Sequence, residues 1–240
     1  MHTPYAMNRQ GFRFRHESTS WLRLARFAAG ICFVFQFIAC SGIGQLQFDT
    51  EYTRFSLGPT DLETSGIGFL TPTAATGREA DNQSLALNFA KQLEALRPEI
   101  KVIPLAKILS VVNAANLNAE YKQMYQDYVE TAVLNGEVLK KIGVASGVRY
   151  FAKLSLASFR QETRGRFSLL GLRLFDTKQA NLRVFMEIWD SHTGSVAWEG
   201  GQELNYAYDS SREKPVTFHD MTKIAAKHLY SHLPGANAHP

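Results

Sequence analysis

Residues 182–200 read LRVFMEIWDSHTGSVAWEG, and this stretch decides the fold. Apolar residues occupy every second position of its first half, the pattern of a half-buried β-strand: Leu182, Val184, Met186 and Ile188. The strand is followed by a turn that ends in Gly194, which tolerates a positive φ. Asp190 can accept backbone N–H bonds in that turn, and Trp198 can cover a large apolar area of a sheet. We therefore interpret the stretch as an antiparallel hairpin with a structural role rather than a ligand site.

Two upstream segments, residues 149–159 and 170–174, show the same alternation of side chains. Together with the hairpin they predict an antiparallel meander in the second half of the chain. Four arginines lie between and beside these segments: Arg160, Arg164, Arg166 and Arg173. We interpret residues 161–165 as the solvated hairpin loop that these arginines surround. The alternative is that the arginines contact anionic lipid or cell-wall carboxylates.

The first half of the chain carries short apolar runs and helical patterns instead. Residues 67–72 and 102–104 are typical of short buried strands. A helical apolar face lies between them, closed by Pro98: Leu85, Phe89, Leu93 and Leu96. Further helical patterns follow up to Gly147, and an amphipathic helix over residues 218–233 ends at Pro234. The order predicts an α/β fold with a mixed sheet: a strand-helix-strand start, a helical middle, an antiparallel meander and a C-terminal helix.

One of the middle helices, expected after Asn118, places three phenol rings on one face: Tyr121, Tyr125 and Tyr128. The first interpretation is that the rings belong to the core and their hydroxyl groups reach water at its rim. The second is that the rings form an exposed strip that binds a protein partner, because Tyr is enriched at the anchoring positions of interfaces.

The N-terminal segment is typical of a secretory signal peptide. Five arginines in residues 9–26 precede an apolar run over residues 27–39, which ends in Ala39. The run has about 13 residues, fewer than the roughly 20 that span a bilayer, although a short membrane anchor and an ordinary secretory signal are the alternatives. Because Cys40 follows the small residue, the segment resembles a bacterial lipobox, whose cysteine is acylated, for example with palmitate, and becomes the mature N-terminus. Phe37 departs from the usual Leu of that motif.

These features divide the chain into four parts. We expect a lipoprotein signal peptide at residues 1–39, a lipidated N-terminus and flexible tether at 40–66, an α/β domain at 67–233 and a disordered tail at 234–240. The signal peptide holds five Arg and one Glu, so it carries the whole net charge of +4. The mature chain keeps 21 basic and 21 acidic residues and lacks the basic surface of a nucleic-acid binder. Cys40 is its one cysteine, which leaves no intramolecular disulfide.

The sequence gives no positive reason to expect an enzyme. His228 and His232 have the i, i+4 spacing that can chelate a metal on a helix, and His219 lies nearby. No His-Glu-x-x-His motif or acidic third ligand accompanies them, so we interpret these histidines as exposed residues that complement the helix dipole and expect no metal or other cofactor. Ser146 lacks the spacing of a nucleophile elbow, and the acidic residues form no obvious catalytic pair.

A family resemblance rests on several motifs in order. They are the lipobox, the strand-helix-strand start, Ile142-Gly143-x-x-x-Gly147-Val148-Arg149-Tyr150-Phe151, and Trp189-Asp190-Ser191-x-Thr193-Gly194-x-x-x-Trp198-x-Gly200. Over residues 66–233 the chain resembles bacterial lipoproteins related to the curli-secretion lipoprotein, the N-terminal domain of the Tol periplasmic protein and the lipoprotein activators of penicillin-binding proteins. The resemblance implies a periplasmic domain that binds other proteins. Residue Ser41, which is not Asp, implies by the enterobacterial rule an outer-membrane location.

These observations lead to one functional expectation and two alternatives. We expect a non-enzymatic envelope lipoprotein, anchored in the outer membrane through acylated Cys40, whose periplasmic domain binds an envelope protein as a regulator or assembly factor. The first alternative is a subunit of an oligomeric outer-membrane secretion channel, for which residues 167–175 are the best membrane-crossing strand. The second alternative is a carrier of a metal or a small molecule.

Overall fold

The structure, a computed structural model, describes residues 45–74, 79–169, 172–210 and 216–235. The elements follow one another as β1 Gln45–Arg54, α2 Asp61–Ser65, β2 Ile67–Phe69, β3 Thr73–Ala74, α3 Glu79–Leu96, β4 Val102–Ile103, α4 Leu105–Ala114, α5 Asn118–Thr131, α6 Gly136–Ser146, β5 Tyr150–Leu169, β6 Leu172–Asp190, β7 Ser195–Ser210 and α7 Phe218–Tyr230. The signal peptide and Cys40 lie outside the described residues, as do residues 236–240.

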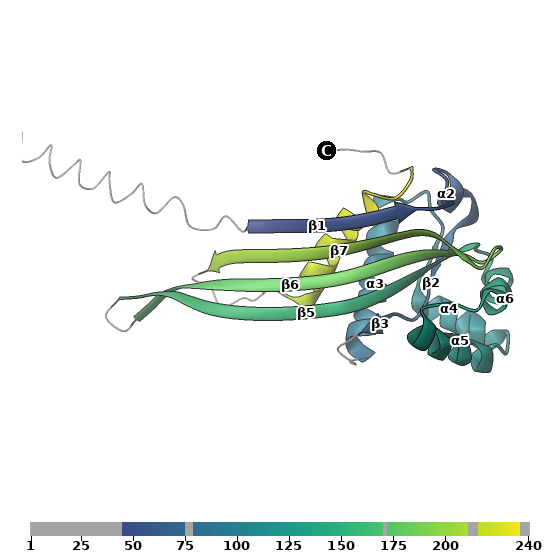
Figure 1. Ribbon diagram of the computed structural model, residues 1–240, viewed down its shortest axis with the longest axis horizontal. Helices are drawn as coiled ribbons and strands as arrows, with labels where there is room; N and C mark the ends of the chain where they lie inside the picture. The colour runs from purple at the N-terminus through teal and green to yellow at the C-terminus, as the bar shows by residue number, and fades with distance from the viewer. Residues whose placement is uncertain (1–44, 75–78, 170–171, 211–215, 236–240) are drawn as a thin grey trace, which may run out of the picture. The chain divides into compact units, whose positions relative to one another are not determined.

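Within the described residues, seven strands form one mixed sheet in the order β1-β7-β6-β5-β2-β4, with β3 also pairing with β5. The short strands β2 and β3 run parallel to β5, whereas β1, β7, β6 and β5 form an antiparallel meander. Figure 1 shows α3 and α7 against one face of the long strands, and α4, α5 and α6 grouped near the start of β5. The α/β class, the mixed sheet and the C-terminal helix predicted from the sequence are confirmed.

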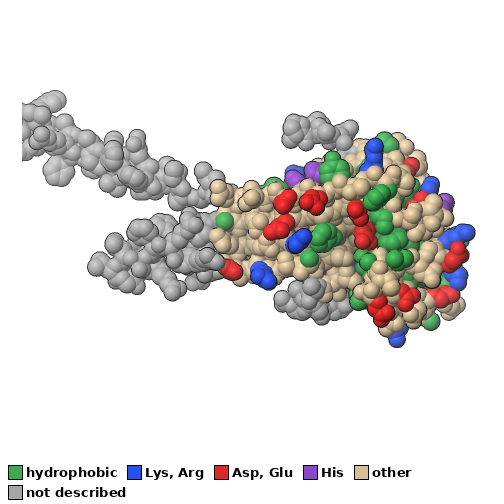
Figure 2. Space-filling model, in the orientation of Figure 1, with side chains coloured by type: hydrophobic (Ala, Val, Ile, Leu, Met, Phe, Trp, Pro, Cys, Tyr) green, Lys and Arg blue, Asp and Glu red, His purple; other side chains and the backbone are tan. Residues whose placement is uncertain are grey.

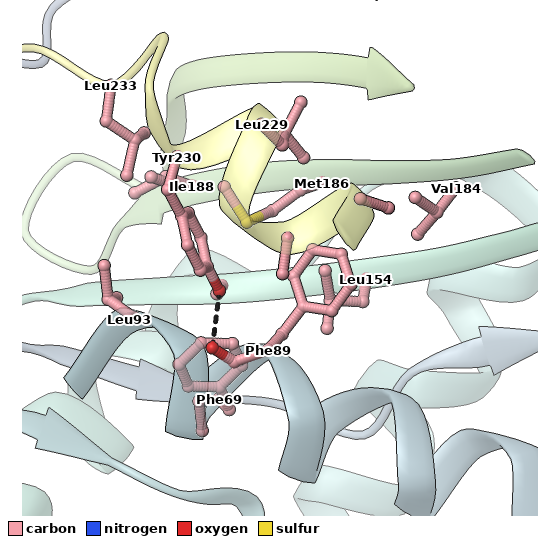
Figure 3. Packing of buried hydrophobic residues seen from close by; sticks show 14 of the residues in the cluster. Phe69, Phe89, Leu93, Leu154, Val184, Met186, Ile188, Leu229, Tyr230 and Leu233 are labelled. Atoms are coloured by element: carbon pink, nitrogen blue, oxygen red, sulfur yellow. Dashed lines mark hydrogen bonds between the residues drawn. The ribbon is translucent and has the colours of Figure 1, made fainter. Parts of the chain in front are cut away.

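The main core lies between the long strands and the helices α3 and α7. The predicted alternation of β6 is present, because Leu182, Val184 and Ile188 are fully buried against these helices. Figure 3 shows how aromatic and aliphatic side chains from α3, β2, the long strands and α7 meet there. Phe89 and Tyr230 pack edge to face with their ring centroids 5.8 Å apart, which joins α3 to α7.

A second core fills the space between the other face of the sheet and helices α4, α5 and α6. It contains Ile108 and Ile142 from the helices together with Phe151 and Trp189 from the sheet. This layer covers only the part of the sheet near the start of β5 and the end of β6. The domain is therefore three layers thick at one end and two layers thick along the rest of the strands.

The turn between β6 and β7 has the structural role that the sequence predicts. Asp190 accepts a hydrogen bond from the backbone N–H of His192 at 2.9 Å and two from the Arg149 guanidinium, at 2.9 and 2.6 Å. Gly194 has a φ of +69° and lies against Gly136, so a side chain there would be both strained and crowded. The turn is thus fixed to β5 and to the start of α6.

The expectation of a flexible tether up to residue 66 is wrong for its larger part. Residues 45–54 form β1, which pairs with β7 over its whole length, and residues 61–65 form α2. The sequence hides the strand because β1 lies at the sheet edge and no residue in it is fully buried, so no strongly apolar face marks it. The folded domain therefore begins near Gln45 rather than near Ile67.

The expected loop at residues 161–165 is also wrong. These residues belong to β5, which pairs with β6 from Tyr150↔Asp190 to Leu169↔Leu172 and is interrupted only by bulges. Phe167 pairs with Phe175, so residues 167–175 fold back on themselves and are not one strand. The prediction that residues 167–175 form a single membrane-crossing strand is therefore wrong. None of the helices in the described part of the chain has both the length and the apolar character needed to span a membrane.

The core leads to a first prediction about stability. Phe89→Ala removes a fully buried ring between α3 and α7, and we expect it to lower the free energy of unfolding by about 3–5 kcal/mol. Phe185→Ala is the matched control, because Phe185 is 40% exposed on the other face of the sheet and should change the stability by less than about 1 kcal/mol. Urea unfolding measures both values, and equal losses for the two variants would contradict this assignment of the core.

Candidate functional site

The candidate site is the part of the sheet that lies beyond the cover of the described helices, with Glu187 at its border, where the carboxylate accepts a hydrogen bond from Tyr128 of α5 at 3.1 Å. It consists of side chains on the face opposite α3 and α7, and we call it the open face: the odd-numbered residues 45–53 of β1, 199–207 of β7 and 179–187 of β6, with Ser155, Ser158, Arg160 and Glu162 of β5. The strand registers align these residues in rows across the four strands. Since alternate residues of a strand share a face, the same pairing that builds the main core arranges this surface.

Acidic residues outnumber basic ones on the open face. The acidic residues are Asp49, Glu51, Glu162, Glu187, Glu199 and Glu203, whereas the basic side chains exposed there are Arg160 and Arg183. Figure 2 shows this face, with acidic side chains gathered over β1 and β7. Residues 40–240 hold equal numbers of basic and acidic residues, so the excess of carboxylates is a property of this surface.

Two of the cross-strand pairs on the open face bring like charges together. Glu187 lies directly opposite Glu199, and Asp49 lies directly opposite Glu203. Like charges at directly opposite positions of a sheet lower its stability. Arg183 lies opposite Glu203, and Lys153 of β5 lies opposite Glu187, so each pair has one basic neighbour in its row. Each row therefore keeps one more carboxylate than basic side chains.

A concavity of about 400 Å³ lies where the open face meets the helical layer. Its lining includes Glu51, Glu187, Glu199 and Phe185. The ring of Phe185 lies over Gly201, where an added Cβ would come within 2.8 Å of it. The Arg183 guanidinium lies 5.3 Å from the centroid of the same ring, a cation–π distance. An apolar ring that is 40% exposed among carboxylates is the kind of contact that a partner with apolar and cationic side chains could cover.

A second concavity, of about 680 Å³, lies further along the strands and has a polar lining in which two arginines and two glutamates balance. Arg160 lies in it and is exposed. Beside it Asn181 donates hydrogen bonds to Glu203 at 3.1 Å and to Asn205 at 2.7 Å. Of the arginines proposed as a contact surface, Arg160 is therefore on the open face. The side chains of Arg164, Arg166 and Arg173 lie outside the described residues.

The three tyrosines of α5 do not form an exposed strip. Tyr121 and Tyr128 are 9% and 8% exposed, and the three hydroxyl groups bond to the backbone N–H of Thr71 (2.9 Å), the carbonyl of Pro72 (3.2 Å) and the carboxylate of Glu187 (3.1 Å). The interpretation of Tyr121, Tyr125 and Tyr128 as a partner-binding surface is thus wrong, and the core interpretation holds. Sequence spacing could not decide between them, because a core face and an interface face have the same helical period.

The tyrosines enclose a lysine that the sequence does not single out. Lys153 is 1% exposed, donates a hydrogen bond to the carbonyl of Thr71 at 2.9 Å and lies 4.5 Å from the centroid of the Tyr128 ring. Burial lowers the pKa of Lys153 to about 7, against a partial opposing effect of Glu187. Burial also raises the pKa of Glu187, and burial together with Glu187 raises the pKa of Tyr128 to about 12. The described contacts of the enclosed amine are thus with a backbone carbonyl and two tyrosine rings.

His228 of α7 and His232, just beyond its end, are half-buried and packed rather than exposed as expected, whereas His219 is exposed. His228 stacks on Phe48 of β1 with the ring centroids 4.0 Å apart, and His232 lies 4.8 Å from the ring of Tyr52. Burial lowers the pKa of both histidines, and the neighbouring His232 adds to the effect on His228. Within the described residues no group of three or more His, Cys, Asp or Glu side chains could hold a metal ion.

Comparison with known proteins gives remote likenesses only. No family model matches the chain, and no curated protein matches it. Solved structures with a similar fold include the PelC dodecamer from Paraburkholderia phytofirmans, with 13% identity, a TM-score of 0.44, and coverage of 78% of this chain and 98% of that one. Another is lipoprotein GNA1162 from Neisseria meningitidis, with 11% identity, a TM-score of 0.35, and coverage of 70% and 99%. TM-scores below 0.5 are too low to argue function from, and the resemblance to the three groups named above stays an expectation.

The buried lysine leads to a second prediction. The pKa of Lys153 is about 7 in the folded protein and about 10.4 in an unfolded chain, so the unfolded chain binds more protons between these values. The stability of the protein relative to Lys153→Met should therefore rise with pH from about 7 to 10, by on the order of 1.4 kcal/mol per unit at most. Urea unfolding of both proteins across this range measures the difference. Lys140→Met, at an exposed position of α6, is the control and should show no such trend.

Proposed function

We propose that this chain is a non-enzymatic lipoprotein of the bacterial envelope, held on the outer membrane by acylated Cys40, which binds another envelope protein through the open face. The single observation that carries the proposal is the acidic, partly apolar surface that β1, β7, β6 and β5 leave uncovered. The role that fits it is that of a regulator or assembly factor, which acts by association and needs no catalytic group.

The partner that this surface suits presents basic side chains. The pairs Glu187–Glu199 and Asp49–Glu203 each hold one carboxylate more than their basic neighbour in the row can balance, and a cationic partner would balance it on binding. Phe185 supplies an apolar contact within the charged surface. The same excess of carboxylates argues against nucleic acid or anionic lipid as the ligand of the open face.

Because β1 begins at Gln45, the segment that would link the domain to an anchor at Cys40 is shorter than the tether expected from the sequence. Cys40 precedes the first described residue of β1, Gln45, by only five positions. At about 3.3–3.6 Å per residue these positions span at most about 18 Å, against the roughly 80 Å reach of a tether that ran to residue 66. An anchored domain would therefore stay next to its membrane, and its partner would have to bind it there.

Acylation at Cys40 is tested by the mass of the protein extracted from its own membranes. We expect the mass of residues 40–240 plus acyl chains, together with incorporation of labelled palmitate. Cys40→Ala should abolish both, because the thiol is the acceptor of the lipid. An unprocessed mass for the natural sequence would remove the membrane anchor from the proposal but leave the open face as a binding surface.

The open face is tested by a photoreactive amino acid at position 185, introduced into the full-length protein in cells. We expect a discrete crosslinked product from position 185 and none from position 144, because Val144 is 82% exposed but lies on α6, away from the open face. Charge reversal by Glu51→Lys with Glu199→Lys should reduce the product at least tenfold.

Glu94→Lys is the matched control for this charge reversal, because Glu94 is exposed on α3, which covers the opposite face of the sheet. It should leave the crosslinked product unchanged. The proposal fails if the amount of crosslinked product from position 185 is the same with and without the charge reversal, or if position 144 gives the same product.

A further inference from the structure

Strand β1 leaves one long edge of the sheet unpaired. Among the described residues the sheet begins with β1, which pairs with β7 alone, and Figure 1 shows it as the outermost strand. Its 10 residues contain no proline or lysine, and its register with β7 has no bulge. Prolines, lysines and bulges are devices that commonly keep a sheet edge from pairing, and a very short edge strand such as β4, with two residues, is another. Strand β1 is therefore the edge that can accept a further strand.

The backbone groups of alternate β1 residues point toward this free edge. Just after β1, the N–H of Phe55 donates to the carbonyl of Ala197 at 3.0 Å, in continuation of the register between β1 and β7. The backbone groups of successive strand residues point to opposite edges, so the odd-numbered residues of β1 direct theirs toward β7. The even-numbered residues of β1 direct theirs toward the free edge: Leu46, Phe48, Thr50, Tyr52 and Arg54.

The side chains of β1 give the free edge two different faces. On the open face the carboxylates of Asp49 and Glu51 are exposed. On the face that borders α7, the side chains of Leu46, Phe48 and Tyr52 are 38%, 36% and 55% exposed. The concavity of about 400 Å³ on the open face reaches this edge, since Glu51 is part of its lining. A strand added beside β1 would thus meet carboxylates on one face and apolar side chains on the other.

We propose that the partner of the open face adds an extended segment to β1 as a further strand of the sheet, with basic residues on the open face and apolar residues on the α7 side. The inference rests on the proposed function, because it names how that partner binds. Main-chain hydrogen bonds to the even-numbered residues of β1 hold the segment, and its alternate side chains give specificity. Directly opposite residues have Cβ atoms about 5 Å apart, so a basic residue beside Asp49 or Glu51 forms a favourable cross-strand pair.

Charge argues against a second copy of this chain as the added strand. Two copies that pair antiparallel through β1, with their open faces on the same side, are related by a twofold axis. The two registers with the greatest overlap then place Asp49 opposite Asp49, or Asp49 opposite Glu51. Like charges at directly opposite positions are destabilising, whereas opposite charges are stabilising. The edge therefore favours a segment that is basic at alternate positions.

The test uses a fluorescent peptide of alternating lysine and valine with the length of β1, 10 residues, and the full-length protein in mild detergent. We expect the peptide to bind, as measured by fluorescence anisotropy. A peptide of five lysines followed by five valines has the same charge and composition, but we expect it to bind at least tenfold more weakly. N-methylation of all lysines, or of all valines, removes the N–H groups from one edge of the peptide at a time. One of these two peptides should lose binding and the other should keep it.

A matched pair of variants tests the edge from the side of the protein. Thr50→Pro removes an N–H that points to the free edge and leaves the hydrogen bonds between β1 and β7 intact. Thr50→Val keeps that N–H but loses the same hydroxyl contacts, with Gln202 and His228. We expect Thr50→Pro to weaken peptide binding about tenfold and Thr50→Val to change it by less than about threefold. Far-ultraviolet circular dichroism checks that both variants are folded, and if Thr50→Pro is not, the N-methylated peptides decide.

The outcomes separate strand addition from the proposed function. Strand addition is wrong if the alternating peptide does not bind, if the block peptide binds equally well, or if both N-methylated peptides bind as the parent does. A charge-dependent crosslink from position 185 would in that case still support the open face as the binding surface. If Thr50→Pro weakens peptide binding but the crosslink does not respond to charge reversal, strand addition to β1 stands and the wider open face fails.

Discussion

The packing of α3 and α7 against one face of β5, β6 and β7 is the constraint on which the rest of the structure depends. These helices come from opposite ends of the domain, and buried polar contacts join them: the Tyr230 hydroxyl donates to the carbonyl of Phe89 at 2.9 Å, and Asn88 donates to Thr222 at 2.8 Å. Because long antiparallel strands have one apolar face, covering it determines which side chains lie on the other face. The polar surface that we assign to a partner is thus a direct consequence of where the core lies.

Much of this fold can be predicted from the sequence because buried residues recur with the period of the strand or helix that carries them. Leu182, Val184 and Ile188 alternate since one face of β6 is buried along its length, and Leu85, Phe89 and Leu93 recur as a helix with one buried stripe requires. Strand β1 is different. Its residues alternate between a polar face and a half-exposed face that borders α7, so neither face is apolar enough to stand out. The distal part of β5 is hidden for the same reason, because it extends beyond the core.

The candidate site was less predictable than the fold. The spacing of Tyr121, Tyr125 and Tyr128 places them on one face but is equally compatible with a core and with an interface. The open face depends on strand register, which aligns Glu187 with Glu199 and Asp49 with Glu203 from segments far apart in the chain. A single sequence contains no record of which strands are neighbours, so these pairs could not be identified without the structure. The burial of Lys153 was not predictable because its residue type predicts exposure, and the groups that enclose it, Thr71 and the tyrosines of α5, are distant in the sequence.

The proposed anchor limits how a partner could reach the open face. If Cys40 is acylated, the five positions up to Gln45 keep the start of β1 within about 18 Å of the membrane. With its strands upright on such an anchor, the domain would stack the rows of the open face above the membrane. A partner bound to the same membrane would then meet the row that contains Arg160 before the row that contains Glu199. The concavity beside Phe185, which is lined by three of the six acidic residues of the open face, lies at the far end of the strands, so a partner on that membrane would have to extend away from it to fill the concavity.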